Sequence, residues 1–202
     1  MAKVRLTKNE LKNQRMALQR YERFLPTLQL KKQQLQIEAR KLRKRYEELE
    51  AQEKECQNEV EKWVALLDEE RRDELLSLVK VQSLELGTRN IAGLDTPMFE
   101  GLTFKDIEYD LFGTPLWYDE AIRSLKTLIS AQMEKKILGE QLALVEAELR
   151  ITTQRVNLFE KVKIPETREN IRIIQIHLGD QQTNAVGRAK IAKAKIQARE
   201  AS

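Results

Sequence analysis

Apolar side chains recur every seven residues through the first third of the chain, in two interleaved series. One series runs from Leu28 to Trp63, and the other lies three residues earlier and runs from Val4 to Leu67, with polar residues at its middle positions. Together they form the a and d positions of a heptad repeat. Such a seam keeps facing a partner helix only when two helices wind around each other. The pattern therefore predicts a long, stiff coiled-coil arm rather than a pocket.

A second apolar seam begins after residue 118. Its members alternate at steps of four and three residues from Leu138 to Phe159, slip by one residue at Pro165, and continue to Leu178. A proline inside a helical pattern ends or bends the helix. Because the apolar pattern resumes at once, we predict a bend there. At Pro26 the helix either restarts or kinks, and we favour a kink because the register carries through.

Helical periodicity disappears between residues 84 and 117. This stretch contains four of the seven glycines and two of the four prolines, with turn-like groups flanked by short apolar clusters. Such a composition favours a small β-hairpin or an irregular knob. It is too short to form a domain alone, so we expect it to pack on the helices. We also expect the helices to form without it.

The whole pattern predicts an all-α fold: a long antiparallel two-helix coiled-coil hairpin with a small central β-hairpin or irregular knob. The expected segments are an N-terminal helix over residues 1–83, the knob over residues 84–117 and a C-terminal helix over residues 118–202. Each arm is about 120 Å long at 1.5 Å per residue. Equal arms place Leu42 opposite the region of Val156, to within one or two helical turns. The predicted seam comprises Leu11, Leu18, Leu25, Leu28, Leu35, Leu42, Leu49, Cys56, Trp63, Leu138, Leu142, Val145, Leu149, Val156, Phe159, Ile171, Ile174 and Leu178.

Composition supports solvated helices and places positive charge at both ends. Charged residues make up 34% of the chain and aromatic residues only 5%, which is typical of long helices with few buried neighbours. The net charge is +4, but residues 1–20 carry +5 (six basic, one acidic) and residues 181–202 carry +4 (five basic, one acidic). A hairpin would join the two ends into one basic tip. We expect Lys190, Lys193 and Lys195 to point outward from it.

No arrangement of reactive side chains suggests catalysis. The single histidine, His177, lies beside a seam position without evident partners, and no phosphate-binding glycine loop occurs. The single cysteine, Cys56, belongs to the seam as a small apolar residue. Trp117 either anchors the knob or contacts a partner. We expect no catalytic residue, cofactor or metal, and no apolar stretch indicates a leader or a membrane helix, so a soluble protein is expected.

Five segments resemble the D subunit of V-type ATPases, and particularly its bacterial members: VRLTKNEL with LPTLQLKKQQLQIE, then GTRNIAGLDTP, then NLFEKVKIPETRENIRIIQIHLGDQQ with VGRAKIAKAKI. The resemblance covers nearly the whole chain in order. One departure is residues 179–182, where many members carry a more acidic helix without glycine.

The resemblance implies a rotor shaft without an active site of its own. In that family, the shaft turns inside a ring of catalytic A and regulatory B subunits, binds the small F subunit of the stalk and docks on a further protein above the membrane ring. It couples ATP hydrolysis or synthesis to H⁺ or Na⁺ movement, on the cytoplasmic side and without inserting into the membrane. Two alternatives are a structural coiled-coil tether or scaffold, which would need no basic end, and a nucleic-acid-binding coiled coil. The basic tip lacks the interleaved aromatics of a nucleic-acid module.

Overall fold

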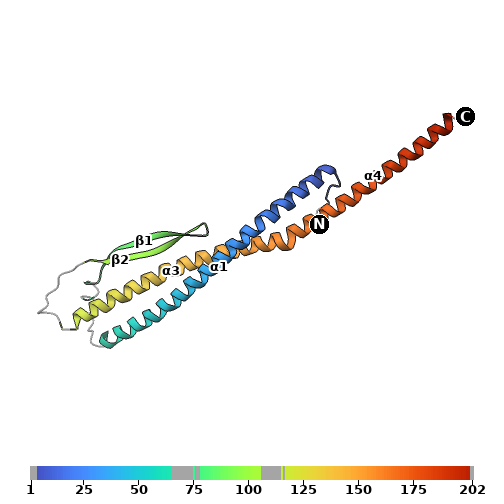
Figure 1. Cartoon of the computed structure of the whole chain (residues 1–202). Helices are drawn as coiled ribbons and strands as arrows, with labels where there is room; N and C mark the ends of the chain where they lie inside the picture. Colours follow the sequence, from blue (N-terminus) through green and yellow to red (C-terminus); the bar gives the residue numbers. More distant parts are fainter. Residues whose placement is uncertain (1–3, 65–74, 76–77, 106–114, 116, 201–202) are drawn as a thin grey trace. The chain divides into compact units, whose positions relative to one another are not determined.

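The computed structural model describes residues 4–64, 75, 78–105, 115 and 117–200, with the elements labelled in Figure 1. Helix α1 spans Lys8–Val64, strands β1 and β2 span Val81–Ile91 and Leu94–Phe104, and helix α3 spans Tyr118–Leu158. A π-helical turn, η1, covers Phe159–Lys163 and leads into α4, Ile164–Glu200. The predicted fold of long helices with a small antiparallel β-hairpin is confirmed. Two compact units are present, residues 32–151 and residues 1–31 with 152–202, and they are described separately.

Helix α1 begins with a side-chain cap from Thr7. The Thr7 hydroxyl accepts a hydrogen bond from the Glu10 backbone N–H at 3.3 Å, which satisfies one of the N–H groups that lack a partner in the first turn. The helix then continues through Pro26. Of the two alternatives at that proline, the restart is therefore wrong, and the helix is continuous as we favoured.

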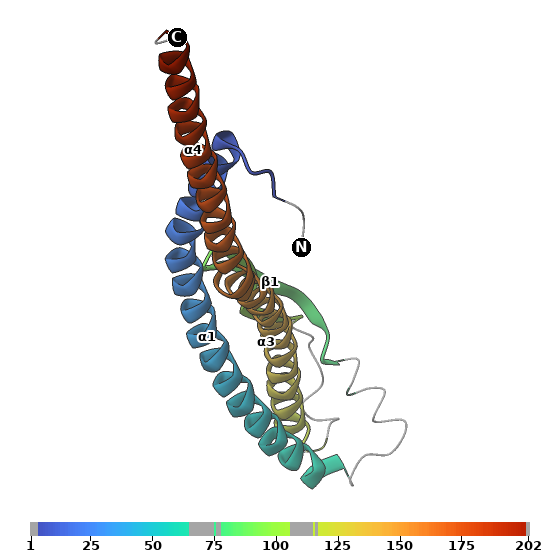
Figure 2. The same cartoon turned by 90° about the vertical axis from the view of Figure 1, so that its right-hand side faces the viewer.

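In the unit of residues 32–151, α1 and α3 lie side by side and run in opposite directions (Figures 1 and 2). Arg43 pairs with Glu146, whereas Glu53, further along α1, pairs with Lys135, which is earlier in α3. A buried cluster joins the two helices; it contains Leu35, Ala39, Leu42, Ile91 and Val145, with Leu138, Leu142 and Leu149 against it. The expected register was wrong, because Leu42 packs in this cluster with Val145.

The β-hairpin closes through a two-residue turn and packs on the same helix pair. Ala92 and Gly93 have φ values of 52° and 81°, and Ile91 pairs with Leu94, as in a type I′ turn. Ile91 is 4% exposed and belongs to the cluster of Leu35 and Val145. Strand β1 begins at Val81, three residues before the expected boundary at residue 84.

A second cluster lies at the base of the hairpin. Tyr118, Ala121 and Ile122, from the first turns of α3, pack with Leu75 and Val79. Trp117 packs against this cluster, with its ring 5.1 Å from that of Tyr118. These contacts support the interpretation of Trp117 as an anchor.

In the other unit, the start of α1 pairs with the region around the π-turn. The Tyr21 and Phe159 rings are 5.1 Å apart, and Arg168 donates to Glu22 at 2.7 Å. The π-turn ends with the Ile164 N–H bonded to the Phe159 carbonyl, one residue further back than in an α-helix. This wider turn lies where the sequence register slips beside Pro165. Helix α4 then continues through Gly179 without a break.

Candidate functional surface along the interhelical seam

The seam residues predicted from the heptads are all at least half-buried where the structure describes their side chains. The fully buried ones are Leu35, Leu42, Leu49, Val145, Val156 and Ile174. The half-buried ones are Leu11, Leu18, Leu25, Leu28, Cys56, Leu138, Leu142, Leu149, Phe159, Ile171 and Leu178. The side chain of Trp63 lies outside the described part of the chain. The apolar seam therefore supplies contact along both units rather than a cavity.

A polar layer interrupts the seam between α1 and α3. The Lys135 ammonium donates to Glu53 at 2.7 Å and lies 5.5 Å from the centre of the Tyr46 ring. The hydrogen bond from Lys135 holds the pKa of the Glu53 carboxyl below its usual value, although burial acts in the opposite direction. The same hydrogen bond raises the pKa of Lys135. On the facing helix Gly139 lies beside the Tyr46 ring, and a Cβ there would make an ordinary van der Waals contact with the ring at 3.5 Å. A directional layer of this kind opposes sliding of one helix along the other.

Ion pairs flank the seam on its solvent side. Arg43 donates twice to Glu146, at 2.9 and 2.6 Å, and Arg45 donates to Glu134 at 3.0 Å. All these side chains are substantially exposed except Glu134. Exposed pairs each contribute about 0–1 kcal/mol, so they favour the observed pairing without dominating stability.

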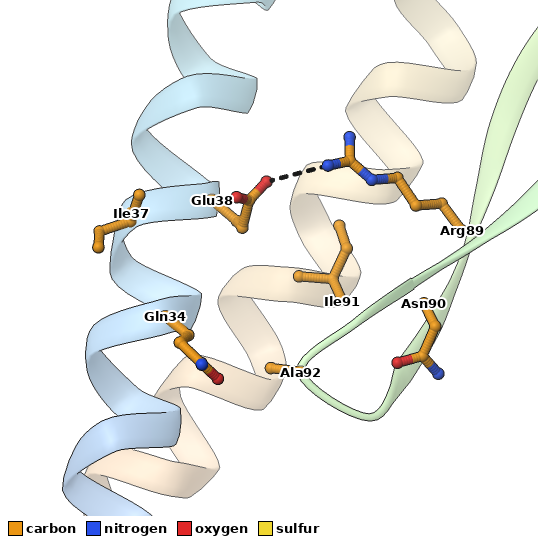
Figure 3. Close-up of a pocket in the computed structure, with 7 residues that line it drawn as sticks. All are labelled: Gln34, Ile37, Glu38, Arg89, Asn90, Ile91 and Ala92. Carbon is orange, nitrogen blue, oxygen red and sulfur yellow. Dashed lines mark ion pairs between the residues drawn. The ribbon is translucent and has the colours of Figure 1, made fainter.

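A groove of about 470 Å³ lies beside the contact between the hairpin and the helices and is lined by the tip of the hairpin and by α1 (Figure 3). Ile37 and Ile91 are among its lining residues, and Arg89 approaches Glu38 across it at 3.7 Å. The other face of the hairpin tip is attached through a buried hydrogen bond between Gln141 and Thr96, 3.0 Å long. The hairpin thus contacts both helices at one level.

The C-terminal part of α4 is exposed to solvent along its described length. Every described side chain from Gly179 to Arg199 is exposed, and Lys190, Lys193 and Lys195 are among them. Large apolar side chains are exposed in the same stretch, with Ile191 at 60% and Ile196 at 56%. An exposed helix that mixes apolar and basic side chains is typical of a segment that contacts another molecule.

Reactive side chains do not converge in the described ranges. Burial raises the pKa of the Cys56 thiol, and Glu59 and Glu55 raise it further, which opposes thiolate formation. The His177 ring contacts Gln181 at 3.1 Å. Within residues 4–64, 78–105 and 117–200, no group of three His, Cys, Asp or Glu side chains is placed to hold a metal ion. None of the helices described contains a stretch long and apolar enough to cross a membrane.

Several buried contacts escaped the sequence interpretation. Gln141 is 4% exposed and Thr96 is 1% exposed, but a polar residue in a helix or near a turn gives no sign in the sequence that it is buried. Ile137 and Thr167 are buried beside the predicted seam. Their positions adjacent to seam residues could have suggested a wider apolar face.

Comparison with known proteins assigns this arrangement to a family. Residues 10–194 match the family model for the D subunit of ATP synthase. The chain is 44% identical over 196 residues to the V-type ATP synthase D subunit of Borreliella burgdorferi, an alignment that covers 97% of this chain and 96% of that protein. It is 34% identical to the protein of the same name from Chlamydia pneumoniae, over 98% of this chain and 95% of the relative. A similar relative from Chlamydia trachomatis serovar L2 is 33% identical over 97% of both chains. The chain belongs to the family of ATP synthase D subunits.

Proposed function

We propose that the chain is the non-catalytic central-stalk subunit, the rotor shaft, of a V-type ATPase or ATP synthase. The observation that carries this proposal is the family match over nearly the whole length, on a chain whose two units are each built from packed long helices. The family match leaves a free-standing tether or a nucleic-acid-binding coiled coil without support.

The contacts suit a part that transmits torque. A twist applied to one helix must displace its partner if interlocked side chains fill the space between them. Leu35 and Val145 are both 0% exposed in the same cluster, and the Glu53–Lys135 layer adds a directional link. Close packing resists deformation because even small shifts lose contacts. The helix pair is therefore expected to be stiffer than a single helix.

The partners in this proposal are the A and B subunits of the ring, the small F subunit of the stalk, and the protein that docks the stalk on the membrane ring. The chain would work in the cytoplasm at the membrane surface, without inserting into it. It would couple ATP hydrolysis or synthesis to transport of H⁺ or Na⁺, with the ion bound elsewhere in the complex. Its basic C-terminal segment, with Lys190, Lys193 and Lys195 exposed, would enter the collar formed by the ring.

The test is reconstitution of the ATPase with altered C-terminal segments. Removing residues 185–202 should leave a folded protein, because the side chains described there are exposed, but should weaken assembly with the ring and lower the torque measured in single-molecule rotation. Reversing the three lysines to glutamate should weaken assembly in a salt-dependent way, since exposed charges are screened over about 10 Å at 0.1 M salt. Lys→Gln at the same three positions is the matched control and should give an intermediate defect. Failure of the tagged parent chain to recover ATPase ring subunits at low salt would refute the proposal itself.

A further inference from the structure

The tip of the β-hairpin packs against both α1 and α3 through an apolar contact, and this contact alone does not define the position of the hairpin along the helices. Ile91 packs against Leu35 and Ala39 on one helix and Val145 on the other. Apolar side chains recur along both helices at steps of three or four residues, about one helical turn: Leu35, Ala39 and Leu42 on α1, and Leu138, Leu142 and Val145 on α3. Since apolar burial is non-directional, Ile91 would also find apolar neighbours one helical turn away. Another contact must select the observed position.

That contact is a short chain of buried hydrogen bonds between α3 and both strands. The Gln141 side-chain amide donates to the Thr96 hydroxyl at 3.0 Å, and this hydroxyl donates to the backbone carbonyl of Arg89 at 2.9 Å. Gln141 and Thr96 are 4% and 1% exposed. Moving the hairpin by one turn, about 5.4 Å, would separate the two side chains and leave buried polar groups without partners, which is unfavourable.

The contact on the other side of the hairpin is far less restrictive. Arg89 and Glu38 approach to 3.7 Å, and the Arg89 side chain is 53% exposed. As Figure 3 shows, Arg89 and Glu38 lie across the groove from each other. A long, solvated side chain can follow a shifted partner at little cost. At the hairpin tip, position along the helices therefore depends on Thr96 and Gln141, whereas at the base of the hairpin Val79 and Phe104 pack with the first turns of α3.

We propose that the Thr96–Gln141 pair is a register key: it fixes the level at which the hairpin sits on the helix pair and so makes the hairpin tip a brace between α1 and α3. Buried polar residues can select one register of an otherwise apolar interface at a cost in stability. The brace holds the hairpin, and whatever its solvent-facing side contacts, at one height on the helices.

The experiment measures hairpin position and stability separately in the full-length chain. Cys56 is replaced by alanine, and spin labels are attached at Thr88→Cys and Glu140→Cys, both exposed positions outside the key. The distance between the labels is then measured by electron spin resonance, and stability by urea unfolding. The parent should give a single narrow distance distribution.

The variants separate the effect of side-chain volume from the effect of the Thr96–Gln141 hydrogen bond on the position of the hairpin. Thr96→Val combined with Gln141→Leu keeps the volume but removes the key. It should unfold at the parent's urea concentration or higher, yet show an additional population displaced by about 5 Å, one helical turn. Thr96→Ser keeps the hydroxyl and should retain the single narrow distance, as should Ile91→Val, which weakens the apolar contact but leaves the key intact.

Two outcomes would overturn the proposal. One is a single parent-like distance in the double variant, which would show that apolar packing alone positions the hairpin. The other is an additional population in Thr96→Ser or Ile91→Val as large as that in the double variant. These measurements use the isolated chain, so they do not depend on its role as a rotor shaft.

Discussion

Replacing Leu35 with alanine removes a side chain from the centre of the contact between α1, α3 and the hairpin. Leu35 is 0% exposed and shares its cluster with Ile91 and Val145. Leucine and alanine both favour helix, so the substitution reports loss of packing rather than loss of helix propensity.

The expected cost follows from the cavity that the substitution creates. Buried leucine-to-alanine changes destabilise proteins by about 2–5 kcal/mol, from lost transfer free energy and an incompletely filled cavity. Three elements meet at Leu35, which limits how far they can collapse onto the space, so we expect about 3–4 kcal/mol. For a chain of this size that corresponds to a fall of roughly 6–16 °C in melting temperature, at about 2–4 °C per kcal/mol.

Unfolding in urea, followed by circular dichroism at 222 nm, measures the change in the free energy of unfolding. The matched control is Leu144→Ala, because Leu144 lies on α3 in the same unit but is 42% exposed. It should cost under about 1 kcal/mol. Equal losses in the two variants, or a loss below about 1 kcal/mol for Leu35→Ala, would refute the assignment of Leu35 to a tightly packed core.

Three further predictions follow from the contacts between and within the elements. With Cys56 replaced by alanine, the double variant Arg43→Cys with Glu146→Cys should form a cross-link within one chain. The control, Arg43→Cys with Glu120→Cys, should not, because Glu120 is 26 residues from Glu146, about 39 Å along α3. Cross-links found only between chains would contradict the antiparallel pairing. The pKa of the Glu53 carboxyl is 4.5 in the unfolded chain and lower in the folded one, so its ionised form stabilises the fold at pH values above 4.5. This contribution is lost as the pH falls through the lower, folded pKa. The stability difference between the parent and Glu53→Gln should therefore be largest near neutral pH and shrink below pH 4.5 in urea titrations, and a difference independent of pH would count against the Lys135 contact. Ala92→Asn should stabilise the hairpin by about 1 kcal/mol, since asparagine tolerates the positive φ of 52° better than alanine does; a lower urea midpoint would show that the turn is not strained.

The sequence predicted the helices well because their apolar positions repeat at a spacing that only helices bring to one face. It could not predict their register. Leu35, Leu42 and Leu49 are chemically identical, so the apolar pattern alone fits several alignments, and the choice depends on specific pairs such as Arg43–Glu146. The start of β1 was also missed. Val81, Gln82 and Ser83 continue a stretch that is compatible with a helix, whereas pairing of Val81 with Phe104 makes it a strand.

The hairpin was predicted as an accessory that the helices do not need. That prediction stands untested, and the burial of Ile91 against Leu35 and Val145 adds a stability cost to removing the hairpin. Replacing residues 88–112 with a linker would uncover an apolar patch, so the variant should keep its helices but with a lower urea midpoint. The sequence predicted that this segment packs on the helices, but not that Ile91 makes the contact, because a short, glycine-rich segment offers no indication of which of its few apolar residues is buried.

The π-turn at Phe159–Lys163 is a place where the chain can lose one residue without rotating the helix that follows. Buried positions before it are separated by three or four residues, but Phe159 and Ile164 are five apart, and the wide turn absorbs the additional residue while Ile164 and Ile174 remain buried. Deleting the exposed Val162 would return this step to four residues and leave the same face buried. A one-residue insertion or deletion in an ordinary α-helical turn would instead rotate the apolar face of everything that follows by about 100°, at 3.6 residues per turn. Length variation of a single residue among relatives should therefore concentrate in this turn.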